Sequence, residues 1–427
     1  MLLTTMAVLI VLLAASIPVA ATLGLLALFL GSVYSPMPLY LALGESFWQN
    51  GVEYVLVAVP LFIMLGEILL RSGIAESMYG AMAQWLSWLP GGLMHSNIGS
   101  CAVFAATSGS SVATAATVGT VAIPEIEKRG YNGPLFLGTI AAGGTLGILI
   151  PPSINLIVYG MLTDTSVPQL YLAGFVPGFL LAGLFMVTVI IACLFRPKWG
   201  GVKIQTTWAA RIASLPAMIP PLVIFGVVVG TIYAGWATPT EAASLGVVAS
   251  LGLAAMKGRL TWLMLRLAIE GTMRSTAMVL LIILAAIFLN FVLATIGLTT
   301  QLSEFIANLG WSPVQTMLAI IVFYIILGCF METFSMLITT TPLVAPIVFS
   351  LGYDPVWFGI MLTVLMETAL ITPPVGLNLY VVQGLRKSGA LNDVIKGSLP
   401  FVGTMFALIA LLMLFPDIAL WLPRQFY

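Results

Sequence analysis

Two pairs of adjacent prolines, Pro151-Pro152 and Pro373-Pro374, interrupt long apolar stretches of this chain. Proline lacks a backbone N–H and its ring clashes with the preceding helical turn, so two in succession break a helix. Irregular backbone inside a membrane is tolerated only where it is buried in protein or lines a cavity. Each proline pair therefore predicts a place at membrane depth where backbone groups can coordinate a bound species.

The composition places both breaks in a lipid bilayer. Of 427 residues, 60% are hydrophobic and 7% are charged, whereas a soluble domain carries about 25% charged residues. The sequence thus predicts an all-α, polytopic membrane protein. The apolar N-terminal residues 1–33 are expected to divide at Pro18. Further segments able to span or re-enter the bilayer lie at about residues 54–70, 97–124, 134–159, 171–195, 214–234, 238–256, 275–297, 313–350, 356–382 and 398–422.

Several classes of function are excluded by composition. Fifteen basic residues balance 15 acidic ones, which leaves no basic surface for nucleic acid, and the phosphate loop of ATPases is absent. The cysteines are widely separated, so neither a redox pair nor a zinc framework is expected. His95 is the sole histidine, and we expect it to be an ordinary interfacial side chain. The cysteines are Cys101, Cys193 and Cys329.

The two breaks belong to an internal repeat with an offset of 373 − 151 = 222 residues. A single offset that holds over about thirty residues indicates a duplicated unit. The same offset pairs Pro124 with Pro346, Gly130 with Gly352, Tyr131 with Tyr353 and Phe136 with Phe358.

Positive charge predicts that the two units are inverted. Lys128 and Arg129 precede Gly130, whereas no Lys or Arg occurs between Arg274 and Arg386. By the positive-inside rule, the loop at Gly130 is cytoplasmic and the equivalent loop in the second half is extracytoplasmic. Inverted repeats with broken helices are the architecture of secondary transporters, whose sites lie near the midplane between the halves.

A segment rich in small polar residues lies upstream of each break. Residues 97–124 centre on Thr107 to Ser111, and both ends are expected on the cytoplasmic side, which predicts a re-entrant hairpin with its tip at residues 108–111. Residues 313–350 centre on residues 328–335 and predict a second hairpin from the opposite face. The hairpin tips favour ion sites, although close helix packing through small residues is an alternative.

Other functions remain as alternatives at this point. Gly109-Ser110-Ser111 superficially suggests a serine hydrolase, but no base is available within the spans to activate Ser110. An ion or solute channel also fits inverted halves, although two breaks opposite polar hairpin tips suit an occluded site better than a pore. Thr238 and Glu241 instead predict a structural feature, the capping box of a helix that starts at Pro239.

Four motifs together resemble the large membrane subunit of tripartite ATP-independent periplasmic (TRAP) transporters, of the DctM type. The resemblance covers nearly the whole chain. It implies a non-enzymatic, sodium-coupled importer of a small organic anion, usually a carboxylate such as a C4-dicarboxylate or a sugar acid, working by an elevator mechanism in the bacterial inner membrane. The motifs are Thr107 to Thr117, Gly143 to Ser153, Ala237 to Ala243 and Thr372 to Asn378.

The resemblance also implies partners and a division of the chain. The expected partners are separate polypeptides: a small four-helix membrane subunit (DctQ-like) and a periplasmic substrate-binding protein (DctP-like). The expected regions are N-terminal scaffold helices in residues 1–92, the first half of the transport domain in 93–170, scaffold helices in 171–310, the second half of the transport domain in 311–390 and a C-terminal helix in 391–427.

Two sodium sites are expected, because broken helices supply the hydroxyl and carbonyl oxygens that sodium prefers. The resemblance places the first between hairpin and break, and the repeat offset, to within one residue, gives the second. The first set is Ala105, Ser108, Gly147, Ile150 and Pro152; the second is Gly328, Met331, Ala369, Thr372 and Pro374.

The anionic substrate is expected to meet helix N-termini, because neither hairpin tip nor break carries Lys or Arg. Intramembrane carboxylates are functional candidates: Glu332 lies at the second tip and Glu367 lies six residues before Pro373. Glu367 could hold a cation, accept a proton or simply bond to nearby backbone. Asn155 and Asn378 could simply cap the broken helices. The expected substrate-binding residues are Ser110, Ser111, Asn155, Thr333, Asn378 and Glu332.

Overall fold

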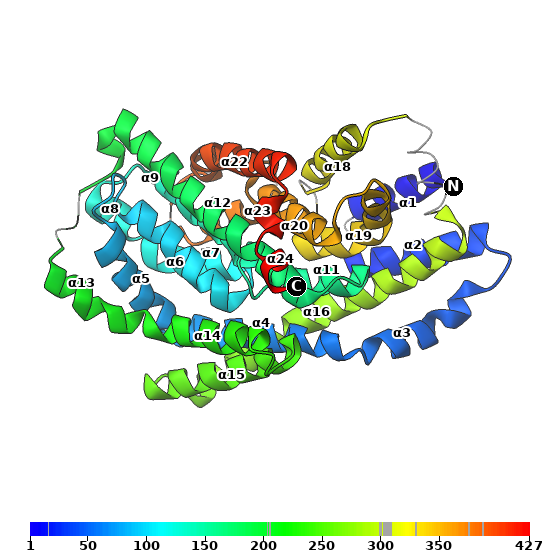
Figure 1. Cartoon of the computed structure of the whole chain (residues 1–427), viewed down its shortest axis with the longest axis horizontal. Helices are drawn as coiled ribbons and strands as arrows, with labels where there is room; N and C mark the ends of the chain where they lie inside the picture. The colour runs from blue at the N-terminus through cyan, green and yellow to red at the C-terminus, as the bar shows by residue number, and fades with distance from the viewer. Residues whose placement is uncertain are drawn as a thin grey trace.

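The computed structural model describes residues 1–15, 17–202, 204, 206–298, 301, 310–328, 331–374, 376–386 and 388–427. These residues are helical apart from turns and loops, and they contain no strand beyond an isolated bridge between Tyr131 and Gly200. Figure 1 shows the helices packed in an elongated bundle. The all-α fold expected from the composition is therefore confirmed.

Residues 2–86 form the helices that precede the first repeat unit. The segment at residues 1–33 divides as expected, close to Pro18. The short helices α3 and α5 have no counterpart among the predicted segments. The elements are α1 (Leu2–Ala14), α2 (Val19–Tyr34), η1 (Leu39–Ala42), α3 (Leu43–Gly51), η2 (Tyr54–Val57), α4 (Ala58–Arg71) and α5 (Ile74–Leu86).

The first repeat unit and the connecting helices follow. Thr238 caps α15 and forms the predicted capping box with Glu241. The elements are α6 (Leu93–Ser108), α7 (Ser111–Ala122), α8 (Glu125–Arg129), α9 (Gly133–Gly144), α10 (Leu146–Leu149), α11 (Ile154–Thr163), α12 (Val167–Phe195), η3 (Pro197–Trp199), α13 (Trp208–Ser214), η4 (Leu215–Ala217), α14 (Ile219–Tyr233), α15 (Pro239–Met256) and α16 (Trp262–Thr295).

The second repeat unit and the C-terminal helices complete the chain. Cys329 and Phe330, which belong to the predicted tip of the second hairpin, lie outside the described residues. The elements are α18 (Pro313–Gly328), α19 (Thr333–Ser350), α20 (Pro355–Ile371), α21 (Leu377–Gly384), α22 (Leu391–Leu414), α23 (Asp417–Leu420) and α24 (Pro423–Phe426).

The helices are long and apolar enough for a multi-pass membrane protein. Among the described residues, six helices have the length and composition to cross a membrane, and up to eight do if each of two bent pairs counts as one span. The two bent pairs include the first break, where Gly133–Leu149 and Ile154–Thr163 meet at 42°. The proline pairs thus interrupt helices as predicted, between α10 and α11 and between α20 and α21.

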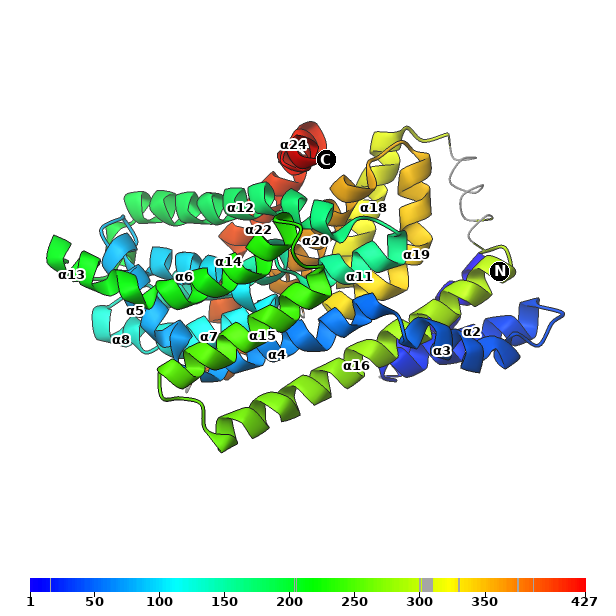
Figure 2. The ribbon, with the colours of Figure 1, turned by 60° about the horizontal axis from the view of Figure 1, so that its bottom comes forward.

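A layer of long helices lies along one side of the repeat units. Helix α16 runs the length of this layer, packing against α2 and α4, while α4 also packs against α15 (Figure 2). The repeat units cross over each other: α7 packs against α21, and α11 packs against α19. The helix after each break therefore contacts the hairpin of the other half.

Glycines bring the C-terminal helix α22 close to the first repeat unit. Any side-chain carbon added at Gly138 would meet the backbone of Gly397 on α22, and one added at Gly397 would meet the carbonyl of Pro134. Helix α12 approaches the first break in the same way, because a carbon at Gly174 would lie 2.6 Å from the carbonyl oxygen of Leu149. The division into scaffold and transport domains stays a prediction, but α12 and α22 both pack on the repeat units.

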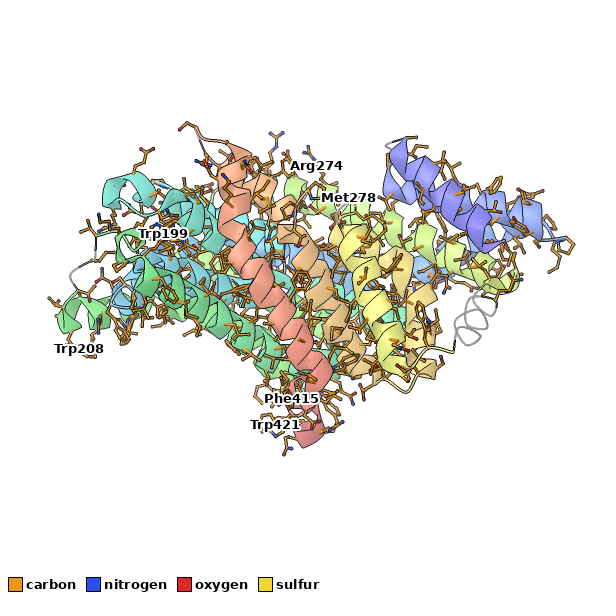
Figure 3. All side chains as sticks on the ribbon, turned by 90° about the horizontal axis from the view of Figure 1, so that it is seen from above. Trp199, Trp208, Arg274, Met278, Phe415 and Trp421 are labelled. Carbon is orange, nitrogen blue, oxygen red and sulfur yellow. The ribbon has the colours of Figure 1, made fainter. Side chains whose placement is uncertain are left out.

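The two loops that the repeat pairs, at Tyr131 and Tyr353, contact different residues. The Tyr131 hydroxyl accepts a hydrogen bond from the backbone N–H of Leu93 at 3.0 Å. Tyr353 instead stacks on Trp357, whose indole N–H donates to the carbonyl of Leu412 at 3.0 Å. Leu412 lies in the last turn of α22, and Phe415 and Trp421, which follow this helix, lie at the opposite end of the view from Arg274 (Figure 3). The equivalent loops therefore contact different elements, and the inverted arrangement stays a prediction.

His95 is fully buried in the protein, and its Nε2 lies 2.7 Å from the carbonyl oxygen of Pro90. Pro90 and Gly91 of the preceding turn lie against the ring nitrogen and help to enclose it. His95 lies in the first turn of α6, at the far end of that helix from the hairpin tip.

Candidate transport site

A cavity of about 300 Å³ lies between the two hairpin tips and the layer of long helices. Its lining includes no Lys or Arg. The tips supply its polar groups, and the long helices supply most of the opposite wall. The lining residues are Ile63, Gly66, Glu67 and Leu70 of α4; Ser275, Met278 and Val279 of α16; residues 108–113 and 332–334 of the tips; and Ile148, Ile154, Leu370 and Leu377 beside the breaks.

The first tip is a sharp turn between α6 and α7. Gly109 has a φ of +60°, a conformation that glycine adopts without strain. The next residue, Ser110, caps α7 by accepting a hydrogen bond from the N–H of Ala113 at 3.4 Å. Ser108 lies across the turn, with its hydroxyl 3.0 Å from that of Thr114. The N-terminus of α7, with its free N–H groups, is thereby held at the cavity.

The second tip places the N-terminus of α19 at the same cavity. Glu332 is its N-cap, and its carboxylate accepts hydrogen bonds from the N–H of Ser335 at 3.2 Å and from the hydroxyl of Thr333 at 3.0 Å. The repeat offset pairs Glu332 with Ser110 and Thr333 with Ser111. The structure thus brings four of the predicted substrate-binding residues to one cavity.

The residues of the first expected sodium site come together at the first break. A carbon added at Gly147 would lie 2.6 Å from the carbonyl oxygen of Ser110, so α10 touches the hairpin tip directly. One added at Gly109 would lie 3.0 Å from the carbonyl oxygen of Pro152. The carbonyl oxygen of Ala105 accepts a hydrogen bond from the N–H of Gly109. Ile150 is fully buried beside α12.

Two residues of the second expected sodium site, Gly328 and Ala369, lie in direct contact. A carbon added at Gly328, the last residue of α18, would collide with the methyl group of Ala369 on α20. Met331, which follows Gly328 by three residues in the sequence, is buried. Thr372 caps the end of α20 and its hydroxyl donates to the carbonyl of Thr368 at 2.6 Å, while Pro374 is exposed.

Neither predicted asparagine caps its broken helix. Ser153 is the N-cap of α11 and Gly376 that of α21. The Asn378 side-chain N–H₂ instead reaches the other half, donating to the carbonyl of Ala141 on α9 at 3.2 Å. Asn155 is buried, and both polar atoms of its side chain lack a hydrogen-bond partner among the described residues. The simple capping alternative is therefore wrong for both.

Glu367 connects the two halves. Its side chain is fully buried on α20, and its Oε1 accepts a hydrogen bond from the hydroxyl of Ser111 at 2.7 Å. The partner is a side chain of the other half, not the nearby backbone that the sequence analysis offered as one alternative. The repeat offset pairs Glu367 with Thr145, a residue without charge.

Sequence reasoning missed the wall supplied by α4 and α16. Glu67 faces the cavity, pairs with Arg71 one turn away and occupies the space that a side chain at Gly271 of α16 would need. A carboxylate inside the apolar segment 54–70 was the available signal, because such residues are functional candidates by default. Ser275 and Met278 of α16 gave no comparable signal.

The fold as a whole has a counterpart among solved structures. It is similar to the crystal structure of the YdaH transporter from Alcanivorax borkumensis, with a TM-score of 0.63 over 95% of this chain and 98% of that one, at 16% sequence identity. At that identity the similarity establishes the fold alone.

The sequence establishes the family. Residues 6–418 match the family described as "Tripartite ATP-independent periplasmic transporter, DctM component". The chain is 34% identical over 433 residues to the C4-dicarboxylate TRAP transporter large permease protein DctM of Vibrio cholerae, covering 95% of this chain and 94% of that protein. This chain therefore belongs to the DctM family of TRAP transporter large permeases. It is a transporter and not an enzyme, so the hydrolase alternative for Ser110 is set aside.

Relatives within the family carry different substrate names. The ectoine TRAP transporter large permease TeaC of Halomonas elongata is 30% identical, with 86% of each chain covered. The sialic acid permease SiaM of Vibrio cholerae is 29% identical, with 88% of each chain covered. The isethionate permease DctMQ of Oleidesulfovibrio alaskensis is 30% identical over 95% of this chain but only 64% of its own length. One family thus includes permeases named for chemically distinct organic acids and zwitterions.

Proposed function

We propose that this permease is a sodium-coupled secondary importer of a small organic anion of the carboxylate class, acting in the bacterial inner membrane. The observation that carries the proposal is the cavity of about 300 Å³ between the hairpin tips. Two helix N-termini, those of α7 and α19, end at this cavity. Aligned peptide dipoles and free N–H groups at a helix N-terminus favour a bound anion.

Hydroxyl groups complete the proposed substrate site. Ser110, Ser111 and Thr333 line the cavity beside the helix N-termini. Glu332 lines it too, but its carboxylate is occupied by donors from its own helix, which reduces its repulsion of an anion. A binding site without Lys or Arg holds its ligand loosely enough for release, which a transporter requires.

Sodium would provide the driving force, because the family bears the description "ATP-independent". The proposed sites are the two hairpin-to-break contacts, with Ala105, Ser108, Gly147, Ile150 and Pro152 at the first and Gly328, Met331, Ala369, Thr372 and Pro374 at the second. Moving one positive charge inward across 100 mV contributes about 2.3 kcal/mol. Two sodium ions with one monovalent anion would therefore couple uptake to an inside-negative potential.

An elevator mechanism fits the two-sided wall of the cavity. The hairpin tips form one side, whereas α4 and α16 form the other. If the repeat units move as a body past the long helices, the wall formed by α4 and α16 is removed and the cavity opens. The contact that must slide includes Gly66 of α4, where an added carbon would lie 3.1 Å from the carbonyl oxygen of Ser108.

The partners follow from the tripartite family. We propose that transport requires a small DctQ-like membrane subunit and a DctP-like periplasmic binding protein that delivers the anion. The relative named DctMQ, of which this chain covers 64%, supports the association of a large and a small permease in one functional unit.

Reconstitution tests this function. Proteoliposomes containing this chain and the small subunit should take up a carboxylate only when a loaded binding protein and an inward sodium gradient are both present, and uptake should saturate. An inside-negative potential should accelerate it. Robust, non-saturating flux by this chain alone, unaffected by sodium or by either partner, would reject the proposal and favour a channel.

A further inference from the structure

A second group of buried polar atoms lies behind the cavity, where the halves cross. Glu367 of α20, Ser111 of α7 and Asn378 of α21 are each at most 1% exposed. Ser111 Oγ donates to one oxygen of Glu367. The other oxygen, Oε2, and the side-chain oxygen of Asn378 have no hydrogen-bond partner among the described residues.

Ser111, which bonds to Glu367, also lies close to Asn378. A carbon added at Gly144 of α9 would lie 3.0 Å from the Asn378 amide nitrogen and 3.1 Å from the carbonyl oxygen of Ser111. The amide nitrogen of Asn378 is occupied by the carbonyl of Ala141, which leaves its oxygen as the free group. Glycine at position 144 therefore lets α9, α7 and α21 approach one another closely.

A carboxylate in this position requires a positive partner. Burying an isolated carboxylate is strongly unfavourable, and buried charges are paired or coordinate metals. In the described part of the chain, every ion pair joins other residues, and none includes Glu367. Its charge must be balanced by a proton or by a bound cation.

Oxygen chemistry favours a sodium ion over a proton as that cation. A proton on Oε2 would neutralise the carboxylate, but the side-chain oxygen of Asn378 would still have no donor among the described residues. A small hard cation instead uses unpaired oxygens directly, and carboxylate, amide and hydroxyl oxygens are its preferred ligands. It would satisfy the free oxygens of Glu367 and Asn378 together.

We propose that Glu367, Asn378 and Ser111 form a third sodium site, which bridges the two halves. The site differs from the two hairpin-to-break sites because its ligands come from α7 of the first half and α20 and α21 of the second. Ser111 lines the cavity as well, so sodium at this site would fix the α7 N-terminus against which the anion binds. This inference rests on the proposed sodium-coupled function.

Equilibrium binding of radioactive sodium to the purified full chain, with its small subunit, tests the site without relying on transport. The wild type should bind three ions per chain and Glu367→Gln two, because the amide keeps the acceptor for Ser111 but removes the charge. Glu270→Gln, a change at an exposed residue of α16 paired with Arg266, should bind as the wild type does. Equal stoichiometry in wild type and Glu367→Gln overturns the third site.

The same measurement separates this inference from the proposed function. If the wild type binds one ion and Glu367→Gln none, the bridging site stands and the two hairpin sites fail. If both bind two ions, the hairpin sites stand and the bridging site fails. Should Glu367→Gln not purify as a monodisperse protein, Glu367→Asp should bind three ions with at least one dissociation constant raised about tenfold, and unchanged affinity would overturn the proposal.

Coupling in proteoliposomes provides a second readout. Reversal potentials should give one positive charge fewer per substrate for Glu367→Gln than for the wild type. A proton gradient that drives wild-type uptake in the absence of sodium, and fails to do so in Glu367→Gln, would assign the carboxyl group to proton transfer and overturn the sodium site.

Discussion

At the first hairpin tip the hydroxyl of Ser110 caps α7, whereas at the equivalent position of the second tip the carboxylate of Glu332 caps α19. The same contrast recurs before the breaks, where Thr145 of the first half corresponds to Glu367 of the second. Thr145 bonds to its own helix through the carbonyl of Ala142. Glu367 reaches across to Ser111.

This comparison separates what the duplicated backbone requires from what each half adds. Both halves keep the hairpin, the proline pair and a capped helix at the cavity, because those features place helix N-termini and carbonyl oxygens at membrane depth. The side chains on that backbone differ in charge. Hydroxyls predominate in the first half, and the second half adds two carboxylates, those of Glu332 and Glu367.

The inverted relation of the halves predicts the largest contrast. Lys128 and Ser350 are equivalent by the repeat offset and both are exposed. With the native cysteines replaced by serine, Lys128→Cys should react with a membrane-impermeant maleimide only from the cytoplasm and Ser350→Cys only from the periplasm. Labelling of both from one side would contradict the inverted repeat and the placement of both hairpins.

Larger side chains at the closely packed breaks should impair uptake to a similar extent in the two halves. Gly147→Val would force a side chain into the backbone of Ser110 and Ser111, and Gly328→Val would force one into Ala369. Overpacking of this kind costs about 1–3 kcal/mol or more, so uptake should fall at least about tenfold while membrane insertion persists. Gly183→Val, on α12 with no atom within 4 Å of an added carbon, is the matched control. Near-normal uptake by Gly147→Val would mean that the first tip does not rest on α10 during transport.

Exchanging the caps tests the charge difference between the tips. Ser110→Asp keeps a residue that caps helices well but adds a negative charge to the cavity. Its KM for an anion should rise about tenfold, which corresponds to about 1.4 kcal/mol. Glu332→Ser makes the second tip resemble the first and should lower KM. A shift of both variants in the same direction would show that cap strength, not charge, governs affinity.

Loss of single hydroxyls should have the smallest effect. Ser108→Ala and Thr372→Ala each remove one hydroxyl beside a proposed carbonyl cage, so the sodium concentration for half-maximal uptake should rise a few-fold in each. Thr120→Ala removes a hydroxyl that bonds only to the α7 backbone and serves as the control. If both variants keep the wild-type sodium dependence while Ser110→Ala loses it, the sodium ligands lie nearer the turn than we propose.

Much of the local architecture could be predicted from the sequence because neighbouring residues encode it. Proline pairs break helices wherever they occur, so both interruptions were predictable, as were the first turn at Gly109 and the capping box of Thr238 and Glu241. The repeat offset and the basic residues predicted two related units of opposite orientation. The expected sodium and substrate residues of each tip follow from the same local signals and from the family resemblance.

The contacts between distant segments were decided by the tertiary structure. Ser111 and Glu367 are 256 residues apart, and only the crossing of the two halves brings the hydroxyl to the carboxylate. The wall formed by α4 and α16 likewise depends on the close approach of helices at small residues such as Gly66 and Gly271. Side-chain type and sequence distance do not specify such approaches, because they follow from the packing of whole helices against one another.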